Sequence, residues 1–273
     1  MEEIQNLIID NEVSIRLFFF FGIFVIMAIL ESIFTKRELL LSKSKRWINN
    51  ISLVFLNTII IRILFPTATI GVSMYAHNNG IGLFNIIDLS MMNTIIVSII
   101  LMDLIIYWQH RFFHTINIFW KFHQVHHSDM DYDVTTGFRF HPIEIIFSMI
   151  IKFIFIFILG VPIIAIICFE VLLSAFAIFN HSNIHIPKKI DTFLRLFVVT
   201  PDMHRIHHSI DYQELNSNYG FNISFWDRIF KSYRDTPKEN YTEMTIGLST
   251  LQDEKKTVSL LNILKIPFYK ASF

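Results

Sequence analysis

The sequence predicts an all-α, polytopic membrane protein with a helical cap rich in histidine. The 273 residues are 53% hydrophobic and include 29 phenylalanines, which is too apolar for an ordinary soluble domain. Charged residues still make up 17% of the chain, so polar side chains must gather outside the bilayer. The 23 basic and 23 acidic residues balance, and nothing in this charge pattern indicates a nucleic-acid partner.

The first apolar segment covers about residues 13–34, and a bilayer core requires about 20 apolar residues of a helix. Residues 1–12 are acidic and lack the basic segment and cleavage site of a signal peptide, so we expect this span to stay in the protein. The densest basic cluster of the chain follows, between Lys36 and Arg46. By the positive-inside tendency this loop is cytoplasmic, and the N-terminus lies on the far side.

Two further apolar segments follow before the first histidine pair. The segment 51–75 is interrupted by Arg62 and Pro66, and we interpret it as one imperfect span. Another span near 91–109 returns the chain to the cytoplasmic face. Residues 1–109 are therefore expected to form an N-terminal transmembrane region.

The chain is apolar again from residue 143 to residue 180, broken at Lys152, at Gly160-Val-Pro162 and at Glu170. This length fits two helices of about 18 residues joined by a Gly-Pro turn, near the lower limit for full spans. A hairpin returns to its starting side, so it keeps all the histidine groups on one face. We expect about four transmembrane helices, the last two forming this hairpin.

Beyond Thr200 the chain becomes more polar, which predicts a soluble cap. The apolar patch 258–268 is too short to span a membrane, and it is either a packed terminal helix or an interfacial one. We divide the remainder of the chain into a central histidine-rich region, 110–234, which includes the hairpin, and a C-terminal tail, 235–273.

Histidine is concentrated in the central region, because 11 of the 12 histidines lie between positions 110 and 208. Residues four apart share one helix face, and the chain shows this spacing or a three-plus-one spacing four times. Burying so many imidazoles without metal would cost about 1 to 3 kcal/mol for each unpaired nitrogen. The pattern predicts two metal ions in one shared site, with these ligands: His110, His114, His123, His126, His127, His181, His185, His204, His207 and His208.

The histidine ligands limit the candidate metals but do not select one, because imidazole binds iron, zinc, copper and nickel. The histidines follow directly where apolar segments end, which puts the metal centre close to acyl chains or sterol rings. Such a position suits oxidation of an unactivated C–H bond by dioxygen and a redox-active metal.

Asp103 and Glu170 lie seven and 11 residues before a predicted ligand, offsets that return to nearly the same helix face. Each is a candidate to accept a hydrogen bond from the outer N–H of a ligand. The alternative is an ion pair with a basic residue such as Arg111 or Arg205. Tyr107 shares the face of Asp103 and the same two interpretations.

His141 and Glu144 stand at the mouth of the hairpin. His141 has no histidine partner three or four residues away, so helix capping or a place in the wall of the site is favoured over ligation. Glu144 is a further candidate for the site, and it would be the general base if the metal were a hydrolytic zinc.

These motifs resemble those of the fatty acid hydroxylase and sterol desaturase superfamily of integral membrane di-iron oxygenases. The resemblance covers about Asp103 to Tyr233 and includes His-Arg-Phe-Phe-His at 110–114, His-Gln-Val-His-His at 123–127, Asn-His-Ser-Asn-Ile-His at 180–185, His-Arg-Ile-His-His at 204–208 and Trp-Asp-Arg-Ile-Phe at 226–230. Carried over by position, it implies that the ten histidines hold two iron ions, with zinc as a substitute in isolated protein. Lys231 replaces the glycine usual in the family, and the first hundred residues match only in hydropathy.

The resemblance implies a membrane enzyme that uses dioxygen and external electrons to hydroxylate a lipid, with desaturation as the alternative chemistry. Fatty acyl chains, sterols, carotenoids and ether lipids all remain open as substrates. A separate electron donor of ferredoxin or cytochrome b5 type, with its reductase, is expected. The bacterial cytoplasmic membrane is the favoured location and the endoplasmic reticulum the second. A membrane metal-transport protein and a zinc-dependent lipid hydrolase are the rival functions.

Overall fold

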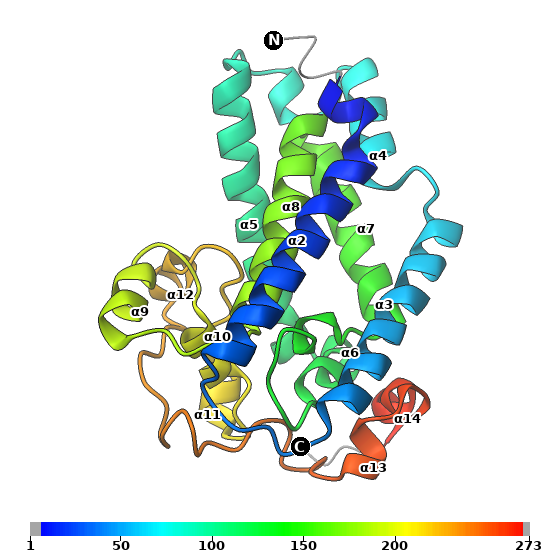
Figure 1. The fold of residues 1–273 in the computed structure, drawn as a ribbon. Coiled ribbons are helices and arrows are strands. Elements are labelled where there is room, and N and C mark those ends of the chain that lie inside the picture. The colour runs from blue at the N-terminus through cyan, green and yellow to red at the C-terminus, as the bar shows by residue number, and fades with distance from the viewer. Residues whose placement is uncertain (1–6, 270–273) are drawn as a thin grey trace.

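The computed structural model describes residues 7–269, and this part of the chain is built from helices and loops (Figure 1). Within residues 7–269 no β-strand forms, and backbone pairing between extended segments is limited to three isolated bridges. The prediction of an all-α fold is confirmed for these residues. Long helices run side by side in one half of the molecule, and short helices gather around their lower end (Figure 1).

Five helical stretches are long and apolar enough to cross a membrane, which supports an integral membrane protein. The expected count of four is not confirmed, because the three apolar segments before residue 110 and the two hairpin helices together give five such stretches. The predicted hairpin is present as the last two. The five are α2 (Glu12–Ile33), the stretch Lys43–Asn85 formed by α3 (Lys43–Leu64), α4 (Ala68–Asn78) and the 3-10 turn η1 (Leu83–Asn85), α5 (Met91–Thr115), α7 (Pro142–Leu159) and α8 (Ile163–Asn180).

Pro66 divides the second stretch into α3 and α4. Proline has no backbone N–H and pushes the preceding residue out of the helical region, and Phe65 accordingly ends α3 with φ −133° and ψ 68°. Arg62 lies in the last turn of α3, and its side chain is exposed. The break thus leaves a basic residue at an interruption in an otherwise apolar stretch.

Gly160 makes the turn between α7 and α8. It has φ +66°, and a Cβ there would lie 2.9 Å from the carbonyl oxygen of Ile81. A residue with a side chain would therefore be strained in its backbone and would clash with the neighbouring loop. The tight turn keeps α7 and α8 adjacent, as the Gly-Pro signal predicts.

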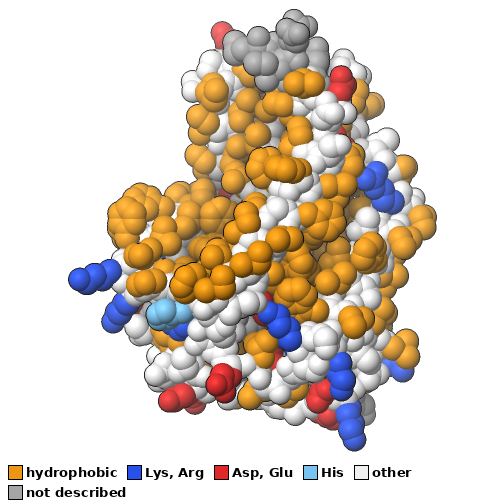
Figure 2. Space-filling model, in the orientation of Figure 1, with side chains coloured by type: hydrophobic (Ala, Val, Ile, Leu, Met, Phe, Trp, Pro, Cys, Tyr) orange, Lys and Arg blue, Asp and Glu red, His pale blue; other side chains and the backbone are white. Residues whose placement is uncertain are grey.

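The lower half of the molecule is a cap of short elements around α6 (Asn117–His127) and α10 (Pro201–His207). Polar and charged side chains gather on this half, whereas hydrophobic side chains cover most of the long helices (Figure 2). The other cap elements are η2 (Thr136–Phe138), α9 (Lys188–Leu194), α11 (Tyr212–Leu215), α12 (Phe225–Ile229), α13 (Glu254–Thr257), α14 (Leu260–Lys265) and η3 (Ile266–Phe268).

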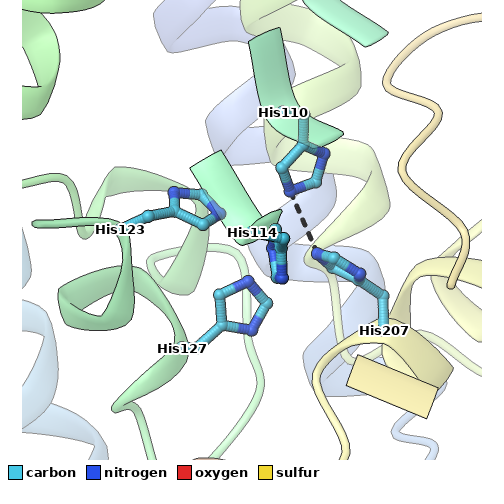
Figure 3. A group of neighbouring side chains, drawn as sticks. All are labelled: His110, His114, His123, His127 and His207. Carbon is cyan, nitrogen blue, oxygen red and sulfur yellow. Dashed lines mark hydrogen bonds between the residues drawn. The ribbon is translucent and has the colours of Figure 1, made fainter. Parts of the chain in front are cut away.

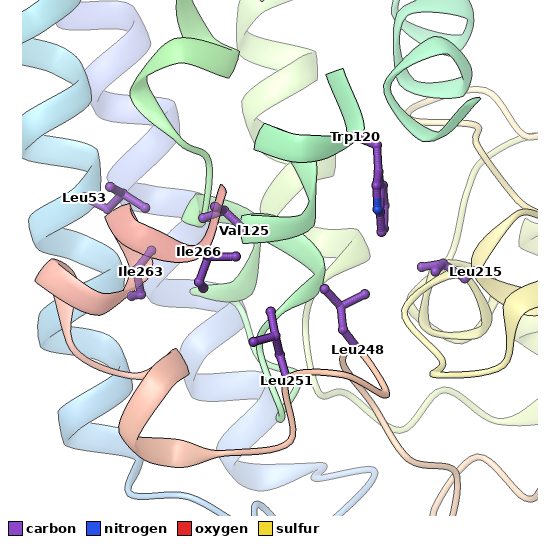
Figure 4. Packing of buried hydrophobic residues seen from close by; sticks show 8 residues of the cluster. All are labelled: Leu53, Trp120, Val125, Leu215, Leu248, Leu251, Ile263 and Ile266. Atoms are coloured by element: carbon purple, nitrogen blue, oxygen red, sulfur yellow. The ribbon is translucent and has the colours of Figure 1, made fainter. Parts of the chain in front are cut away.

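The C-terminal tail packs against the cap and α3 through one apolar cluster (Figure 4). Ile263 and Ile266 of the tail are fully buried, and they share the cluster with Leu53 of α3 and Val125 of α6. Burial of this apolar surface stabilises the tail in place. Of the two interpretations of the patch 258–268, the packed terminal helix agrees with this arrangement.

A buried ionic network fixes the loop that follows α6. Arg46, at the start of α3, has no exposed surface and binds Asp129 at 2.7 Å and Asp133. Arg139 donates to Ser128 Oγ at 2.7 Å and to the carbonyl oxygen of Thr257 at 2.8 Å. Because burial of each charge is matched by a partner, the network holds α3, the loop and the tail in one arrangement.

Candidate metal centre

Nine of the ten predicted histidine ligands meet at the junction of the long helices and the cap. His110 and His114 come from the end of α5, and His181 caps the C-terminus of α8. The other six come from α6 and α10 and from the residue that ends α10. All nine side chains are at most 9% exposed.

The nine histidines form two groups, and within each group the ligand atoms lie within 4.8 Å of one another. Figure 3 shows the rings of the first group around a common point. The first group contains His110, His114, His123, His127 and His207, and the second group contains His126, His181, His204 and His208.

Helical periodicity explains how one motif serves both groups. On α6, His123 and His127 are four residues apart and join the first group, whereas His126 points to the second. The motif at α10 divides in the same way, but the groups are exchanged. His204 and His208, four residues apart, join the second group, and His207 joins the first. Each of these two motifs of three histidines therefore contributes ligands to both groups, and this division brings the two groups side by side.

Hydrogen bonds to carbonyl oxygens at the outer edge of the cluster fix the tautomers of three rings, and a fourth ring bonds a carboxyl group. Nδ1 of His110 lies 2.8 Å from the carbonyl oxygen of Tyr219, and Nδ1 of His207 lies 2.7 Å from that of Ser217. A carbonyl oxygen only accepts, so each Nδ1 carries the proton. His181 bonds the carbonyl oxygen of Ala177 at 2.7 Å in the same way, and His123 bonds Glu144 at 2.6 Å.

These tautomers leave lone pairs facing one another inside the cluster. Nε2 of His110 and Nε2 of His207 are 3.0 Å apart, and neither carries a hydrogen when both Nδ1 atoms donate outward. Such a pair of acceptors is stabilised by a cation between or beside them.

Other nitrogens of the cluster are buried without any hydrogen-bond partner, which costs about 1 to 3 kcal/mol for each one. They are both ring nitrogens of His114, His127 and His208, Nε2 of His123, and Nδ1 of His126 and His204. Neutral imidazoles with free lone pairs at this density fit a site for metal ions.

Burial keeps the histidines outside the helical spans in the neutral form that binds metal. It lowers the pKa of His123 to about 3 and the pKa of His181 to about 4, both from 6.5. Burial also lowers the pKa values of His127 and His208 well below 6.5, and neighbouring histidines lower them further. At neutral pH these rings are therefore available as ligands without loss of a proton.

His185 does not join either group, and its side chain is exposed. Helix α8 ends at Asn180, so the four-residue spacing from His181 to His185 does not lie on a helix. The backbone N–H of His185 bonds the carbonyl oxygen of Phe34 instead, at 2.6 Å. The structure thus removes His185 from the expected cluster.

Glu144 lies against the cluster through its hydrogen bond to His123, and both side chains are buried. His141 does not reach either group. Its Nδ1 accepts a hydrogen bond from the backbone N–H of Ile143 at 3.2 Å and caps the N-terminus of α7. Of the alternatives open for His141, capping is the one that the structure displays.

Asp103 and Tyr107 contact the segment 222–232, which includes α12, and not the ligands. Asp103 accepts from Trp226 Nε1 at 2.8 Å and from two backbone N–H groups, and Tyr107 bonds Ser232 at 2.7 Å. Ser232 in turn donates to Asp227, which accepts from the backbone N–H of Tyr219, so a chain of hydrogen bonds connects Tyr107 to the carbonyl oxygen that bonds His110.

Glu170 lies away from the histidines in an ion pair. Its Oε2 is 2.8 Å from Arg16 Nη1, and its Oε1 is 3.9 Å from Lys152 Nζ and accepts from Thr69 Oγ1 at 3.0 Å. The ion-pair alternative therefore describes Glu170, with partners other than the expected Arg111 or Arg205.

Asp227 belongs to the Trp-Asp-Arg-Ile-Phe motif at 226–230, but the sequence analysis did not include it among the candidate site residues. It accepts hydrogen bonds from the backbone N–H groups of Tyr219 and Gly220, both at 2.8 Å, and from Ser232 Oγ at 2.7 Å. Burial raises the pKa of Asp227 to about 6, against these hydrogen bonds. A Cβ at Gly220 would lie 2.7 Å from Asp227 Oδ2, so glycine is required for this contact.

A cavity of 220 Å³ opens onto the cluster among the lower ends of α5, α7 and α8. His110, His123, His126 and His204 form its polar end with Glu144, and most of its remaining wall is apolar, including Phe113, Phe140, Leu173 and Phe221. Apolar walls around a polar end are typical of a site that binds an apolar molecule and orients it by a few polar groups.

Comparison with known proteins assigns the family. Residues 95–232, just over half of the chain, match the family described as fatty acid hydroxylase. The chain belongs to the fatty acid hydroxylase family. The matched range contains all nine clustered histidines and Glu144, and it begins after α2, α3 and α4.

Relatives of this family member are lipid-modifying enzymes by name. The chain is 28% identical over 152 residues to ornithine lipid hydroxylase OlsE of Rhizobium tropici, which covers 56% of this chain and 45% of the relative. It is 29% identical to alkylglycerol monooxygenase of Xenopus tropicalis, over 54% of this chain and 32% of the relative. Methylsterol monooxygenase 2-2 of Arabidopsis thaliana is 30% identical, over 54% of this chain and 56% of that relative.

The chain thus spans only about a third to somewhat more than half of the relatives that it matches. No solved structure matches this chain.

Proposed function

We propose that this protein is a membrane oxygenase that hydroxylates a lipid at a di-iron centre. The observation that carries the proposal is the pair of adjacent, fully buried imidazole groups at the polar end of an apolar cavity. The names of the relatives, which describe hydroxylases and monooxygenases of lipids, support it.

The proposed ligands of one iron ion are the five histidines of the first group, and those of the other are the four of the second group. Nine histidines replace the ten expected from the sequence, because His185 is exposed. Iron, when bound, would supply the activation of dioxygen: one oxygen atom enters a C–H bond, and the other leaves as water with two electrons from a donor and two protons from solvent. The proposed catalytic region is 110–234, with 1–109 as membrane anchor and 235–273 as a packed tail.

The residues around the centre orient its ligands and exclude water. Glu144 orients His123 by a hydrogen bond, and the carbonyl oxygens of Tyr219 and Ser217 fix the tautomers of His110 and His207. Phe113, Phe140 and Phe221 line the cavity beside the ligands and leave little room for water around a bound acyl chain.

We propose the cytoplasmic side for the cluster. Lys36, in the basic loop after α2, binds Asp202 of α10 at 2.8 Å, so the basic loop lies at the same end as the histidines. The positive-inside tendency then favours a cytoplasmic cap in a multi-pass membrane protein, with the bacterial cytoplasmic membrane as the favoured membrane. A separate electron donor of ferredoxin or cytochrome b5 type would reach the cap from that side.

The experiment is expression in a heterologous host under ¹⁸O-labelled dioxygen, followed by lipid mass spectrometry. We expect a lipid that gains one ¹⁸O atom with the intact protein and with His185→Ala, and no such lipid with His126→Ala. His185→Ala is the matched control, because it removes a family-motif histidine that lies outside both groups.

Three other outcomes would contradict the proposal. Loss of two hydrogens without ¹⁸O would assign the centre to a desaturase. Lipid cleavage that persists without oxygen would assign it to a zinc hydrolase with Glu144 as base. Uptake of metal by vesicles that depends on His126, with no change in any lipid, would assign it to transport, although the ligands lie at the ends of the spans and not at their middle.

A further inference from the structure

A second cavity, of 550 Å³, lies among the long helices α2, α3, α4, α7 and α8. Its size exceeds the 220 Å³ of the cavity at the histidines. Five charged side chains line it, although all five belong to stretches apolar enough to span a membrane. They are Glu12, Arg16, Arg62, Lys152 and Glu170.

The charges in this cavity do not balance. Arg16 lies 3.0 Å from Glu12 and 2.8 Å from Glu170, and Lys152 lies 3.9 Å from Glu170. Arg62 forms no ion pair within residues 7–269, so three basic side chains face two carboxylates. Nη2 of Arg16 is also buried without a hydrogen-bond partner. An unpaired guanidinium at membrane depth is costly, and an anion in the cavity would remove that cost.

The cavity adjoins the smaller cavity at the metal centre. Met149, Lys152, Leu173 and Ser174 line both cavities. Along α7, Lys152 lies eight residues beyond Glu144, which corresponds to about 12 Å of helix rise from the hydrogen-bond partner of His123. A molecule with a polar end at Lys152 therefore needs an apolar part of about this length to reach the histidines.

We propose that this cavity binds the anionic head group, a phosphate or a carboxylate, of the lipid substrate. Arg62 and Nη2 of Arg16 donate hydrogen bonds to the anion, and the chain of the lipid passes Met149 and Leu173 to the histidines. The carbon that is oxidised lies along the chain, away from the bound anion. This assignment rests on the proposed lipid oxygenase and adds the class of substrate to it.

The test measures binding and requires neither iron nor dioxygen. The full-length protein is placed in nanodiscs of neutral lipid and titrated with phosphatidic acid, and bound lipid is counted by native mass spectrometry. Diacylglycerol with the same acyl chains is the neutral probe, and inorganic phosphate is the free-anion probe. The variants are Arg62→Gln, Arg62→Lys and the control Lys189→Gln, which removes an exposed basic residue of α9 that lies outside the cavity.

We expect Arg62→Gln to weaken phosphatidic acid binding about 10- to 100-fold, the effect of losing a charged hydrogen-bond partner, with diacylglycerol binding unchanged. Unchanged diacylglycerol binding also shows that the variant is folded. Arg62→Lys retains most of the affinity, and Lys189→Gln retains all of it.

Equal binding of phosphatidic acid and diacylglycerol by the intact protein would overturn the proposal. So would an Arg62→Gln variant that binds phosphatidic acid normally. Displacement of phosphatidic acid by an equal concentration of inorganic phosphate would assign the cavity to a free anion and overturn the lipid assignment. Because the assay needs neither iron nor dioxygen, these outcomes leave the oxygenase proposal intact. Loss of ¹⁸O incorporation with normal phosphatidic acid binding would instead overturn the oxygenase proposal and leave the anion site in place.

Discussion

The two histidine groups differ in how the protein holds them. Three of the five rings in the first group bond an outer acceptor, namely Tyr219 O, Ser217 O or Glu144. In the second group His181 alone has such a bond, to Ala177 O, and His126 stacks on Phe140 with ring centroids 4.6 Å apart. The first group is thus oriented by hydrogen bonds and the second mainly by packing, so changes outside the cluster should affect the first group more.

Removal of one ligand from either group tests the division most strongly. We expect His207→Ala and His181→Ala each to lower hydroxylation by more than about a hundredfold, because loss of a hydrogen-bond partner alone weakens metal sites about 10- to 100-fold. Metal analysis should show one ion lost in each variant, which mass spectrometry under native conditions can count. Loss of both ions from both variants would mean that the groups bind metal as one unit.

Acid should strongly lower the folding stability of the metal-free protein. Burial lowers the pKa values of His123 and His181 to about 3 and about 4, so the folded state disfavours their protonation. Stability is then complete above the unfolded value of 6.5 and falls as pH drops below it. Each such histidine contributes about 1.4 kcal/mol per pH unit between 6.5 and its folded pKa. Thermal unfolding of the apo protein between pH 8 and pH 5 measures the trend, and a constant melting temperature would contradict the neutral assignment.

Glu144→Gln should affect the first group selectively. The amide replaces the carboxyl group that bonds Nδ1 of His123, and we expect metal affinity of the first group to fall about 10- to 100-fold with the second group unchanged. The control is Glu254→Gln, which removes an exposed carboxylate of α13. Metal titration monitored by native mass spectrometry separates the two affinities, and equal weakening of both would contradict the comparison.

Gly220→Ala should have a smaller effect, again on the first group. The new Cβ would lie 2.7 Å from Asp227 Oδ2 and 3.1 Å from the carbonyl oxygen of Ile223, so the loop that holds His110 must shift. We expect a loss of about 1 to 3 kcal/mol in stability, measured by thermal denaturation. Gly22→Ala in α2 is the matched control, because its Cβ has no neighbour within 4 Å. Equal melting temperatures for the two variants would show that the loop absorbs the change.

The sequence predicted most of the cluster because helical spacing is a local property. It succeeded on α5, which continues through Thr115, and it failed at His185 because α8 ends at Asn180. The helical period of 3.6 residues explains why each motif of three histidines divides between two directions. The orientation of α10 toward α6, however, depends on tertiary packing, which local spacing does not predict. The hydrogen bond between His110 and the carbonyl oxygen of Tyr219 was not predictable, because every residue carries a carbonyl oxygen and the sequence does not indicate which one lies beside the ring.

The second cavity illustrates the same limit at a larger scale. Arg62 and Pro66 were visible as interruptions, and Glu170 and Lys152 as charges in an apolar hairpin. Nothing in their spacing brings them together, because four separate helices must pack before they line one space with Arg16. Sequence periodicity predicts which residues share a face of one helix, and packing decides which faces meet.

The most direct test of the central claim is Mössbauer spectroscopy and iron analysis of the full-length protein reconstituted anaerobically with ⁵⁷Fe. We predict two iron ions per chain in two distinct imidazole-rich environments, and after exposure to oxygen a magnetically coupled pair. One iron ion per chain, two ions without coupling, or no bound iron would contradict a shared di-iron centre built from these two histidine groups.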